Sequence, residues 1–326
     1  MSQGAGATMN SNLHRGVRAV AAGLLCLAAV VGGFRIAAAQ TADVPYVPTP
    51  WNVVDAMLGL ARVGPDDYLI DLGSGDGRIV ITAAKKYGAR GFGVDIDGAL
   101  VSTAQREAQR QGVSDKVAFF TRNLFVTDIS RATVVTMYLF PQVNMRLRPR
   151  FFKELKPGTR IVSHEFDLED WQPDAKLTLA VPDKPYGAPS SDVFLWIVPA
   201  DASGKWRWQL TVAGALREYE LTLEQTFQML QGAPLVAGKD ARFSGGRMRG
   251  ENISFTLVAD IDGREVRHEF SGRVAGDSIS GWVVLNGTVP AVQTEWRAGR
   301  TTRGKLNINT EAPAAARRTL IAEERK

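Results

Sequence analysis

The sequence predicts two folded regions of different class: an α/β region with a mainly parallel sheet covered by helices on both faces, followed by an all-β region. Apolar strand-like runs alternate with helix-like stretches between residues 44 and 200. From 205 to 300, short strands alternate apolar and polar residues and are bounded by glycines. With 326 residues, of which 45% are hydrophobic, the chain is long enough to bury two cores.

The α/β region opens with a helix that starts at Thr49 and Pro50, because proline suits the first turn of a helix. Strands and helices then alternate, and two further apolar runs, 177–181 and 193–198, are expected to close the sheet as a hairpin. The expected strands are 68–72, 91–95, 117–121, 133–139 and 159–164, and the expected helices are 77–87, 98–111 and 142–155. In such Rossmann-like sheets, ligands collect at the carboxyl ends of the strands.

The most informative segment follows the first of these strands. Gly73, Gly75 and Gly77 form a bend without side chains between the strand and the next helix, so a ligand can lie against bare backbone. Asp71 stands before the glycines, and Asp95 ends the next strand. This order of strand, acid, glycines, helix and second acid predicts a nucleotide-type pocket.

The identity of the nucleotide follows from charge. A dinucleotide site needs a third glycine where this chain has Arg78, so a NAD-dependent oxidoreductase is disfavoured. A carboxylate at Asp71 repels a diphosphate and suits a cation, while Asp95 is placed to accept hydrogen bonds from both ribose hydroxyls. S-adenosyl-L-methionine is a nucleoside that carries a sulfonium and an ammonium but no phosphate, and is therefore the predicted cofactor.

With these motifs the sequence resembles the class I, seven-stranded methyltransferases. It is most similar to the protein-lysine methyltransferases that include the mitochondrial enzymes for ATP synthase subunit c and adenine nucleotide translocase, with their bacterial relatives. The resemblance covers about residues 44 to 175. It is carried by the segments 44–50, 71–80, 93–95, 133–141, 155–163 and 171–173. It implies a Rossmann-like methyltransferase sheet, methylation by S-adenosyl-L-methionine, and a lysine side chain of a protein as acceptor.

The predicted cofactor-binding residues are Asp71, Gly73, Ser74, Gly75, Asp95 and Asn123. Asn123 departs from the family, which often has an aspartate there, but an amide also hydrogen-bonds an adenine edge. The resemblance places the acceptor slot at the end of the fourth strand, where Tyr138, Phe140 and Pro141 are the predicted catalytic residues.

His164 is the one histidine of this region, and the sequence leaves open a proton-accepting role or a core histidine with satisfied hydrogen bonds. No metal is expected, because no third ligand stands at suitable spacing from His164 and Glu165.

A net charge of +5 without a long basic helix or zinc spacing disfavours nucleic acid as a partner. The rival hypothesis is a non-catalytic envelope binding protein with a vestigial cofactor pocket.

Residues 1–39 are predicted to be a signal peptide or a membrane anchor. His14, Arg15 and Arg18 precede the apolar run 19–34, and small residues at 37–39 resemble a cleavage site. The run has about 16 residues against the roughly 20 that span a bilayer. The expected location is therefore the periplasm or the membrane, with association through this N-terminal segment.

The region 205–300 is predicted to be an antiparallel barrel, lipocalin-like, or a sandwich. Asp262 and Gly263 are typical of a hairpin turn between two of its strands. Its four tryptophans are expected either to line a ligand cavity or to fill the core: Trp206, Trp208, Trp282 and Trp296. The segment 301–326 is rich in alanine and charge and is predicted to be disordered.

Overall fold

A computed structural model describes residues 1, 46–184, 187–287 and 291–308. Apart from Met1, the expected signal peptide or membrane anchor at 1–39 lies outside these residues, and so do residues 309–326 of the expected tail. The chain divides into two units, residues 1–41 and 42–326, and the described residues after Met1 all belong to the second.

The α/β region is built on a seven-stranded sheet in the order β3-β2-β1-β4-β5-β7-β6. The strands are β1 (Tyr68–Leu72), β2 (Arg90–Asp95), β3 (Val117–Thr121), β4 (Val134–Met137), β5 (Arg160–His164), β6 (Ala175–Ala180) and β7 (Ser190–Ile197). The first five are mutually parallel, and β7 is antiparallel to both β5 and β6. The predicted parallel sheet and its closing hairpin are confirmed, with strand ends shifted by up to two or three residues.

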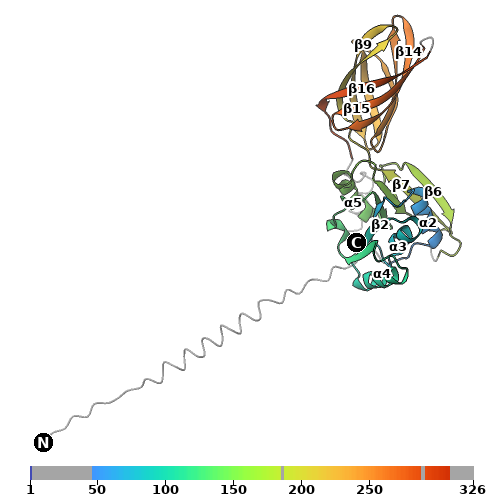
Figure 1. The fold of residues 1–326 in the computed structure, drawn as a ribbon, viewed down its shortest axis with the longest axis vertical. Coiled ribbons are helices and arrows are strands. Elements are labelled where there is room, and N and C mark those ends of the chain that lie inside the picture. Colours follow the sequence, from blue (N-terminus) through green and yellow to red (C-terminus); the bar gives the residue numbers. More distant parts are fainter. Residues whose placement is uncertain (2–45, 185–186, 288–290, 309–326) are drawn as a thin grey trace, which may run out of the picture. The chain divides into compact units, whose positions relative to one another are not determined.

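Helices cover both faces of this sheet (Figure 1). They are α2 (Trp51–Leu60), α3 (Arg78–Tyr87), α4 (Gly98–Arg110) and α5 (Pro141–Glu154). Alternate residues of one strand point to opposite faces. Leu69 of β1 therefore joins a core with α2, α3 and α4, while Ile70 and Leu72 join another with α5. Asp71 and Thr136 point to the same face as Leu69, toward α2 and α3.

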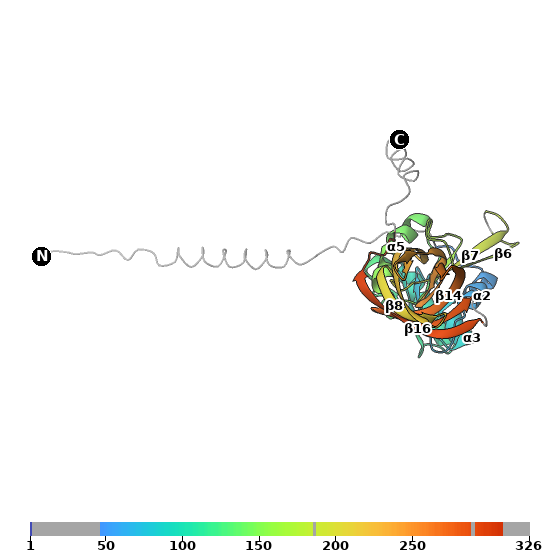
Figure 2. The same cartoon turned by 90° about the horizontal axis from the view of Figure 1, so that it is seen from above.

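The all-β region is a closed eight-stranded antiparallel barrel (Figure 1). Its strands are β8 (Gly204–Val212), β9 (Ala215–Thr226), β10 (Met229–Val236), β12 (Arg242–Arg249), β13 (Asn252–Ile261), β14 (Arg264–Ala275), β15 (Ser278–Asn286) and β16 (Val292–Arg303). A ninth strand, β11 (Lys239–Asp240), pairs only with β10. Pairing of β9 with β10 closes the ring, so the sheet of the barrel has no free edge. Figure 2, seen from above, shows the strands around the barrel.

The barrel interior is packed with side chains, not hollow. Trp208, Phe255, Phe270 and Trp296 are buried and in mutual ring contact, for example at 4.7 Å between the Phe255 and Phe270 centroids. Trp206 is also buried. Three of the four tryptophans thus fill the core, as one of the two hypotheses expected.

Trp282 corrects the expectation that all four tryptophans point inward. The inward positions of β15 are Ile279, Gly281, Val283 and Leu285, so Trp282 lies on the outer face and is 48% exposed. The predicted hairpin at Asp262 and Gly263 does join β13 to β14, and both residues have positive φ.

The final strand runs further than the sequence suggested. β16 ends at Arg303, and Asn307 forms a bridge with Thr226 of β9. Residues 301–303 and Asn307 therefore pair with the barrel, and Ile308 packs against the core of the α/β region, in contrast to the disordered tail expected from residue 301.

The two sheets are joined by direct contacts as well as by the chain. Phe227, in the β9–β10 turn, stacks on Trp171 of the α/β region with ring centroids 5.8 Å apart. Gln228 donates from its amide to the Gln172 carbonyl at 2.7 Å, and Ala200 N donates to Gly250 O at 2.8 Å. Among the residues that the structure describes, no helix has the length and apolar character needed to cross a membrane.

Candidate functional site

Asp71 lies near the carboxyl end of β1 and is almost completely buried, with 2% of its surface exposed. Thr136 of the neighbouring strand β4 donates a hydrogen bond to its Oδ1 at 2.7 Å. Burial, with a smaller contribution from the nearby acids Asp95 and Asp76, raises the pKa of Asp71 to about 7 against the lowering effect of the Thr136 hydrogen bond. A cation placed beside this carboxyl would favour its charged form, so the position suits a positively charged ligand.

The glycine bend that follows has the geometry that only glycine tolerates well. Gly73, Gly75 and Gly77 all have positive φ, at 82°, 52° and 81°. A Cβ on Gly75 would also overlap the Tyr46 ring, and one on Gly77 would lie 2.7 Å from Phe119. The amides of Gly73 and Ser74 both donate to Val94 O at 2.9 Å, which ties the bend to the end of β2.

Asp95 is held at the end of β2 by two backbone amides. Gly75 N donates to its Oδ2 at 2.8 Å and Asp97 N to its Oδ1 at 3.0 Å. These bonds fix the carboxylate and leave each oxygen a further acceptor site, which suits a pair of ribose hydroxyls. Ser74 lies in the same bend, and its Oγ is buried without a hydrogen-bond partner among the described residues.

Asn123 caps the short 3-10 helix η1 (Leu124–Val126) that follows β3. Its Oδ1 accepts from Phe125 N at 2.8 Å. This bond fixes the amide group and leaves the Nδ2 donor for the edge of a base. Either an amide or a carboxylate oxygen can cap this turn, so an asparagine at this position preserves the local structure.

The segment before α2 covers the glycine bend. The Tyr46 ring packs on Gly75, and Thr49 O accepts from Arg78 Nη1 at 2.7 Å. Arg78 also forms an ion pair with Asp76 at 2.6 Å. Burial opposes ionisation of Asp76, but its hydrogen bonds with Arg78 prevail and hold its pKa below the usual range. Arg78, which stands where a dinucleotide motif has its third glycine, therefore holds the segment before α2 against the glycine bend.

The predicted acceptor residues lie at the end of β4. Tyr138 is half-buried, while Phe140 is exposed and precedes Pro141, the first residue of α5. Phe166, which follows β5, packs against both aromatic rings, at 6.3 Å from Tyr138 and 6.0 Å from Phe140. The three rings form one aromatic cluster, of which the sequence analysis identified only two members.

His164 belongs to the buried interior next to this cluster. Its ring centroid lies 4.0 Å from that of Tyr138. Nδ1 lies 3.3 Å from Thr49 Oγ1, and Nε2 lies 3.1 Å from Ser191 Oγ. Burial lowers its pKa to about 4, in spite of the nearby Glu165. A histidine that is neutral and hydrogen-bonded on both nitrogens agrees with the core alternative better than with proton transfer near neutral pH.

Glu165 and Lys184 form an ion pair beside His164 that the sequence analysis did not predict. Lys184 Nζ donates to Glu165 Oε1 at 2.8 Å and to Ser190 O at 2.7 Å, and its side chain is only 8% exposed. The second oxygen, Oε2, lies 3.4 Å from His164 Nε2 and has no hydrogen-bond partner within the described part of the chain. Glu165 also has a positive φ of 70°, a strained conformation for a residue other than glycine. The one sequence signal was a glutamate directly after a strand end.

The described residues contain no group of three or more histidine, cysteine or acidic side chains placed to hold a metal ion. Three features suit an adenosyl ligand with positive charge: the buried carboxyl of Asp71, the bare backbone of the bend, and the unpartnered Ser74 Oγ. The residues present therefore fit the predicted cofactor.

The α/β region is similar to a known protein family and to several known proteins. The family model described as the ANTKMT methyltransferase domain matches residues 71–175. A protein-lysine N-methyltransferase of Saccharolobus islandicus is 46% identical over 156 residues, which are 48% of this chain and 94% of that protein. The adenine nucleotide translocase lysine N-methyltransferase of Mus musculus is 38% identical over 134 residues, 41% of this chain and 58% of that enzyme.

One of the solved structures similar to this chain is also a methyltransferase. An RNA methyltransferase from Salinibacter ruber, in complex with S-adenosyl-L-homocysteine, is 50% identical, with a TM-score of 0.43. The match covers 48% of this chain and 95% of that one. Both this match and the Saccharolobus match leave about half of the chain uncovered.

Proposed function

The chain belongs to the protein-lysine N-methyltransferase family, and from this premise we propose that it methylates a lysine side chain of a protein with S-adenosyl-L-methionine. When bound, this cofactor supplies a methyl group carried on a sulfonium. The amine nitrogen attacks the methyl carbon in line with the carbon–sulfur bond, which breaks as the sulfur leaves. No covalent intermediate with the protein is needed. The task of the chain is to hold the two reactants in line and to exclude water.

The observation that carries the proposal is the pair of carboxylates around the glycine bend. Asp71 supplies a buried negative charge, and Asp95 supplies a carboxylate held in place by two backbone amides. The bend between them brings backbone within reach of the ligand. Together these groups complement an adenosyl group that carries positive charge, and they would repel a diphosphate.

The acceptor is proposed from the aromatic cluster and the neighbouring ion pair. Tyr138, Phe140 and Phe166 offer an apolar slot in which an amine loses its water, which favours the neutral, nucleophilic form. Beside His164, Glu165 already holds the ammonium of Lys184. Lys184 occupies only Oε1 of this carboxylate, while Oε2 is buried without a hydrogen-bond partner among the described residues. We therefore assign Glu165 Oε2 to reception of the acceptor ammonium.

The test is a transfer assay with purified full-length protein, methyl-labelled cofactor and a cell-envelope extract. We expect label in protein, and mass spectrometry of the product should place methyl groups on lysine. Extract treated with protease before the assay is the control and should give no labelled product. Label in RNA alone, or cofactor bound without transfer to any acceptor, would contradict the proposal; the second outcome would favour the envelope binding protein with a vestigial pocket.

We also propose that residues 1–39 direct the protein to the cell envelope, either as a cleaved signal or as an anchor. The proposal is supported by the basic residues before the apolar run and the small residues after it. A reporter that is active on only one side of the membrane, fused after Gln40, tests it. Activity on the cytoplasmic side would contradict export and would also place the enzyme where its cofactor is made.

A further inference from the structure

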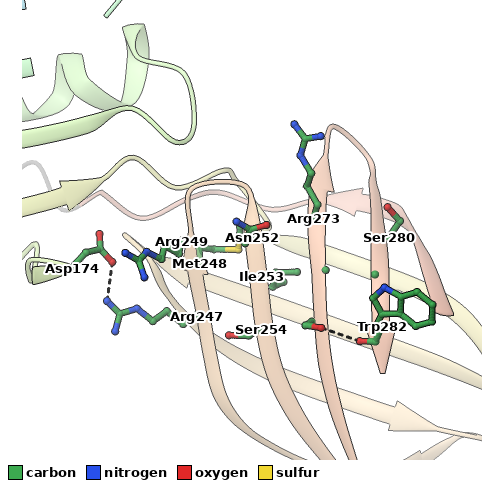
Figure 3. A pocket seen from close by; sticks show the side chains of 13 residues that line it. Asp174, Arg247, Met248, Arg249, Asn252, Ile253, Ser254, Arg273, Ser280 and Trp282 are labelled. Atoms are coloured by element: carbon green, nitrogen blue, oxygen red, sulfur yellow. Dashed lines mark hydrogen bonds and ion pairs between the residues drawn. The ribbon is translucent and has the colours of Figure 1, made fainter. Parts of the chain in front are cut away.

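The outer face of the barrel carries a depression of about 650 Å³ that the methyl-transfer site does not use. Neighbouring strands β12 to β15 place their outward residues in two parallel rows across the sheet (Figure 3). The first row is Arg249, Asn252, Arg273 and Ser280, and the second is Arg247, Ser254, Ser271 and Trp282. These eight residues define what we call the arginine–tryptophan groove.

The charge of the groove is mainly positive. Arg249 is exposed and has no ion-pair partner among the described residues. Arg273 pairs with Glu251, and Arg247 donates to Asp174 at 2.8 Å. Asp174 is the one acid among the lining residues that the structure describes, and its side chain is 2% exposed. Arg247 and Arg273 are each paired with a carboxylate, so within the described chain Arg249 supplies the unpaired positive charge of the groove, which favours an anionic ligand.

Trp282 adds a flat apolar surface at the other end of the groove. Its indole is 48% exposed and packs on no other aromatic ring of the described chain. Ser254 and Ser271 lie beside it in the same row. Hydroxyl side chains both donate and accept hydrogen bonds, and the indole offers a face for stacking and an N–H donor. A tryptophan beside hydroxyls and arginines fits a sugar ring that carries hydroxyls and an acidic group.

Other classes of partner fit this groove less well. A flat bilayer does not reach the floor of a depression. A peptide cannot add as a strand, because β12 to β15 are all paired with two neighbours and offer no free edge. The volume lies within the roughly 300 to 1,000 Å³ of small-ligand sites. Three strand spacings of about 4.8 Å separate the β12 and β15 ends of each row, so the groove is about 14 Å long and suits several linked rings.

We propose that the arginine–tryptophan groove binds a short anionic oligosaccharide. Trp282 stacks on one ring, Arg249 and Arg273 bind acidic substituents, and the serines and Asn252 hydrogen-bond hydroxyls. The eight residues of the groove lie between 247 and 282, outside residues 71–175, which the family model matches; of the lining, Asp174 alone lies within that range. Saccharide binding is therefore tested separately from methyl transfer.

The experiment is calorimetric titration of the full-length protein with trigalacturonic acid, with the neutral maltotriose and an acidic hexapeptide of glutamates as comparison ligands. We expect trigalacturonic acid to bind at least tenfold more tightly than either comparison ligand. Trp282→Ala and Arg249→Ala should each weaken its binding at least tenfold, and Trp282→Phe should retain most of it.

Arg242→Ala is the matched control. Arg242 is exposed on the same strand as Arg249 and pairs with Glu265 at 2.6 Å, but it does not line the groove. It should leave the affinity unchanged. Thermal unfolding of every variant establishes that the barrel is intact. The proposal is overturned if trigalacturonic acid does not bind, if the peptide binds as well as the saccharide, or if folded Trp282→Ala and Arg249→Ala bind like the parent protein.

Discussion

The carboxyl edge of the seven-stranded sheet and the interior of the barrel bury titratable groups in different surroundings. At the edge, Asp71 is buried with a raised pKa, and Ser74 Oγ lacks a partner. In the barrel, the Tyr219 hydroxyl lies 2.8 Å from His268 Nε2, and His268 Nδ1 lies 3.1 Å from Val266 O. Trp208 Nε1 in the barrel and Ser74 Oγ at the edge are both buried without a partner among the described residues, so the two regions differ in their titratable groups. The barrel pairs Tyr219 with His268, whereas the edge keeps the acid Asp71 buried with a raised pKa. Burial of a charged carboxylate is costly, so Asp71 marks a place where a cationic ligand completes the structure.

The largest expected effect tests the packed interior. Phe270→Ala should lower the free energy of unfolding by about 3 to 5 kcal/mol, because Phe270 is buried among Trp208, Phe255 and Trp296 and the cavity would not collapse fully. Denaturant unfolding followed by tryptophan fluorescence measures it. A loss below about 1 kcal/mol would mean that the interior is loosely filled, and the contrast with the sheet edge would fail.

Asp71→Asn should have the next largest effect, and its two consequences have opposite sign. The variant should bind S-adenosyl-L-methionine about 100-fold more weakly, about 2.7 kcal/mol, because the buried negative charge is lost. Without cofactor it should be more stable than the parent protein at pH 8, by about 1 kcal/mol, since the asparagine can still accept from Thr136 and carries no buried charge. Calorimetry and thermal unfolding measure the two. Unchanged affinity would remove Asp71 from the site.

Asp95→Ala should weaken cofactor binding by one to two orders of magnitude, about 1.5 to 3 kcal/mol, through loss of charge-assisted hydrogen bonds. The variant also leaves Gly75 N and Asp97 N without their acceptor. Asp95→Asn is the matched variant, because it loses the charge but keeps one oxygen that can accept from one of these two amides. Calorimetric affinity equal to that of the parent protein in Asp95→Ala would reject this assignment.

The pH dependence of cofactor affinity tests whether the ionised carboxylate of Asp71 binds the cofactor. Its pKa of about 7 in the free protein lies above the usual value of 3.8, so below pH 7 the carboxyl is protonated and must lose its proton to meet a cation. Cofactor affinity should therefore be constant above about pH 8 and fall by up to tenfold per pH unit below 7. Titrations between pH 6 and 8.5 measure it, and Asp71→Asn should show no such slope. A flat profile in the parent protein would contradict the linkage.

The smallest expected effect concerns the acceptor. Glu165→Gln should raise the KM for the protein acceptor about fivefold, equivalent to about 1 kcal/mol, with kcat and cofactor affinity little changed, because reception of the ammonium is weakened. The substitution also removes the counter-charge of Lys184, so thermal unfolding of the variant is measured beside the kinetics. Steady-state kinetics with the methylated protein identified in the envelope extract measure it. An unchanged KM would leave Glu165 as a structural partner of Lys184 only.

Much of the sheet edge was predictable because its signals are local. A strand followed by Asp71 and alternate glycines specifies a turn, and the next strand end supplies Asp95 within 25 residues. The roles of all the site residues stay predictions: Asp71, Gly73, Ser74, Gly75, Asp95 and Asn123 toward the cofactor, and Tyr138, Phe140 and Pro141 toward the acceptor. Lys184 and Phe166 were not predicted, since nothing in their neighbourhood along the chain indicates which strand end they meet.

The sequence by itself determined the order of strands and helices, the class of each region and the charge of the glycine bend, because periodicity, glycine and acidic residues act over a few positions. Only the tertiary structure decided that His164 is neutral, that Glu165 meets Lys184, and that Trp282 faces outward beside arginines of other strands. Burial, ion pairing and strand register depend on segments distant in the chain, and they are fixed only when the sheets close and pack.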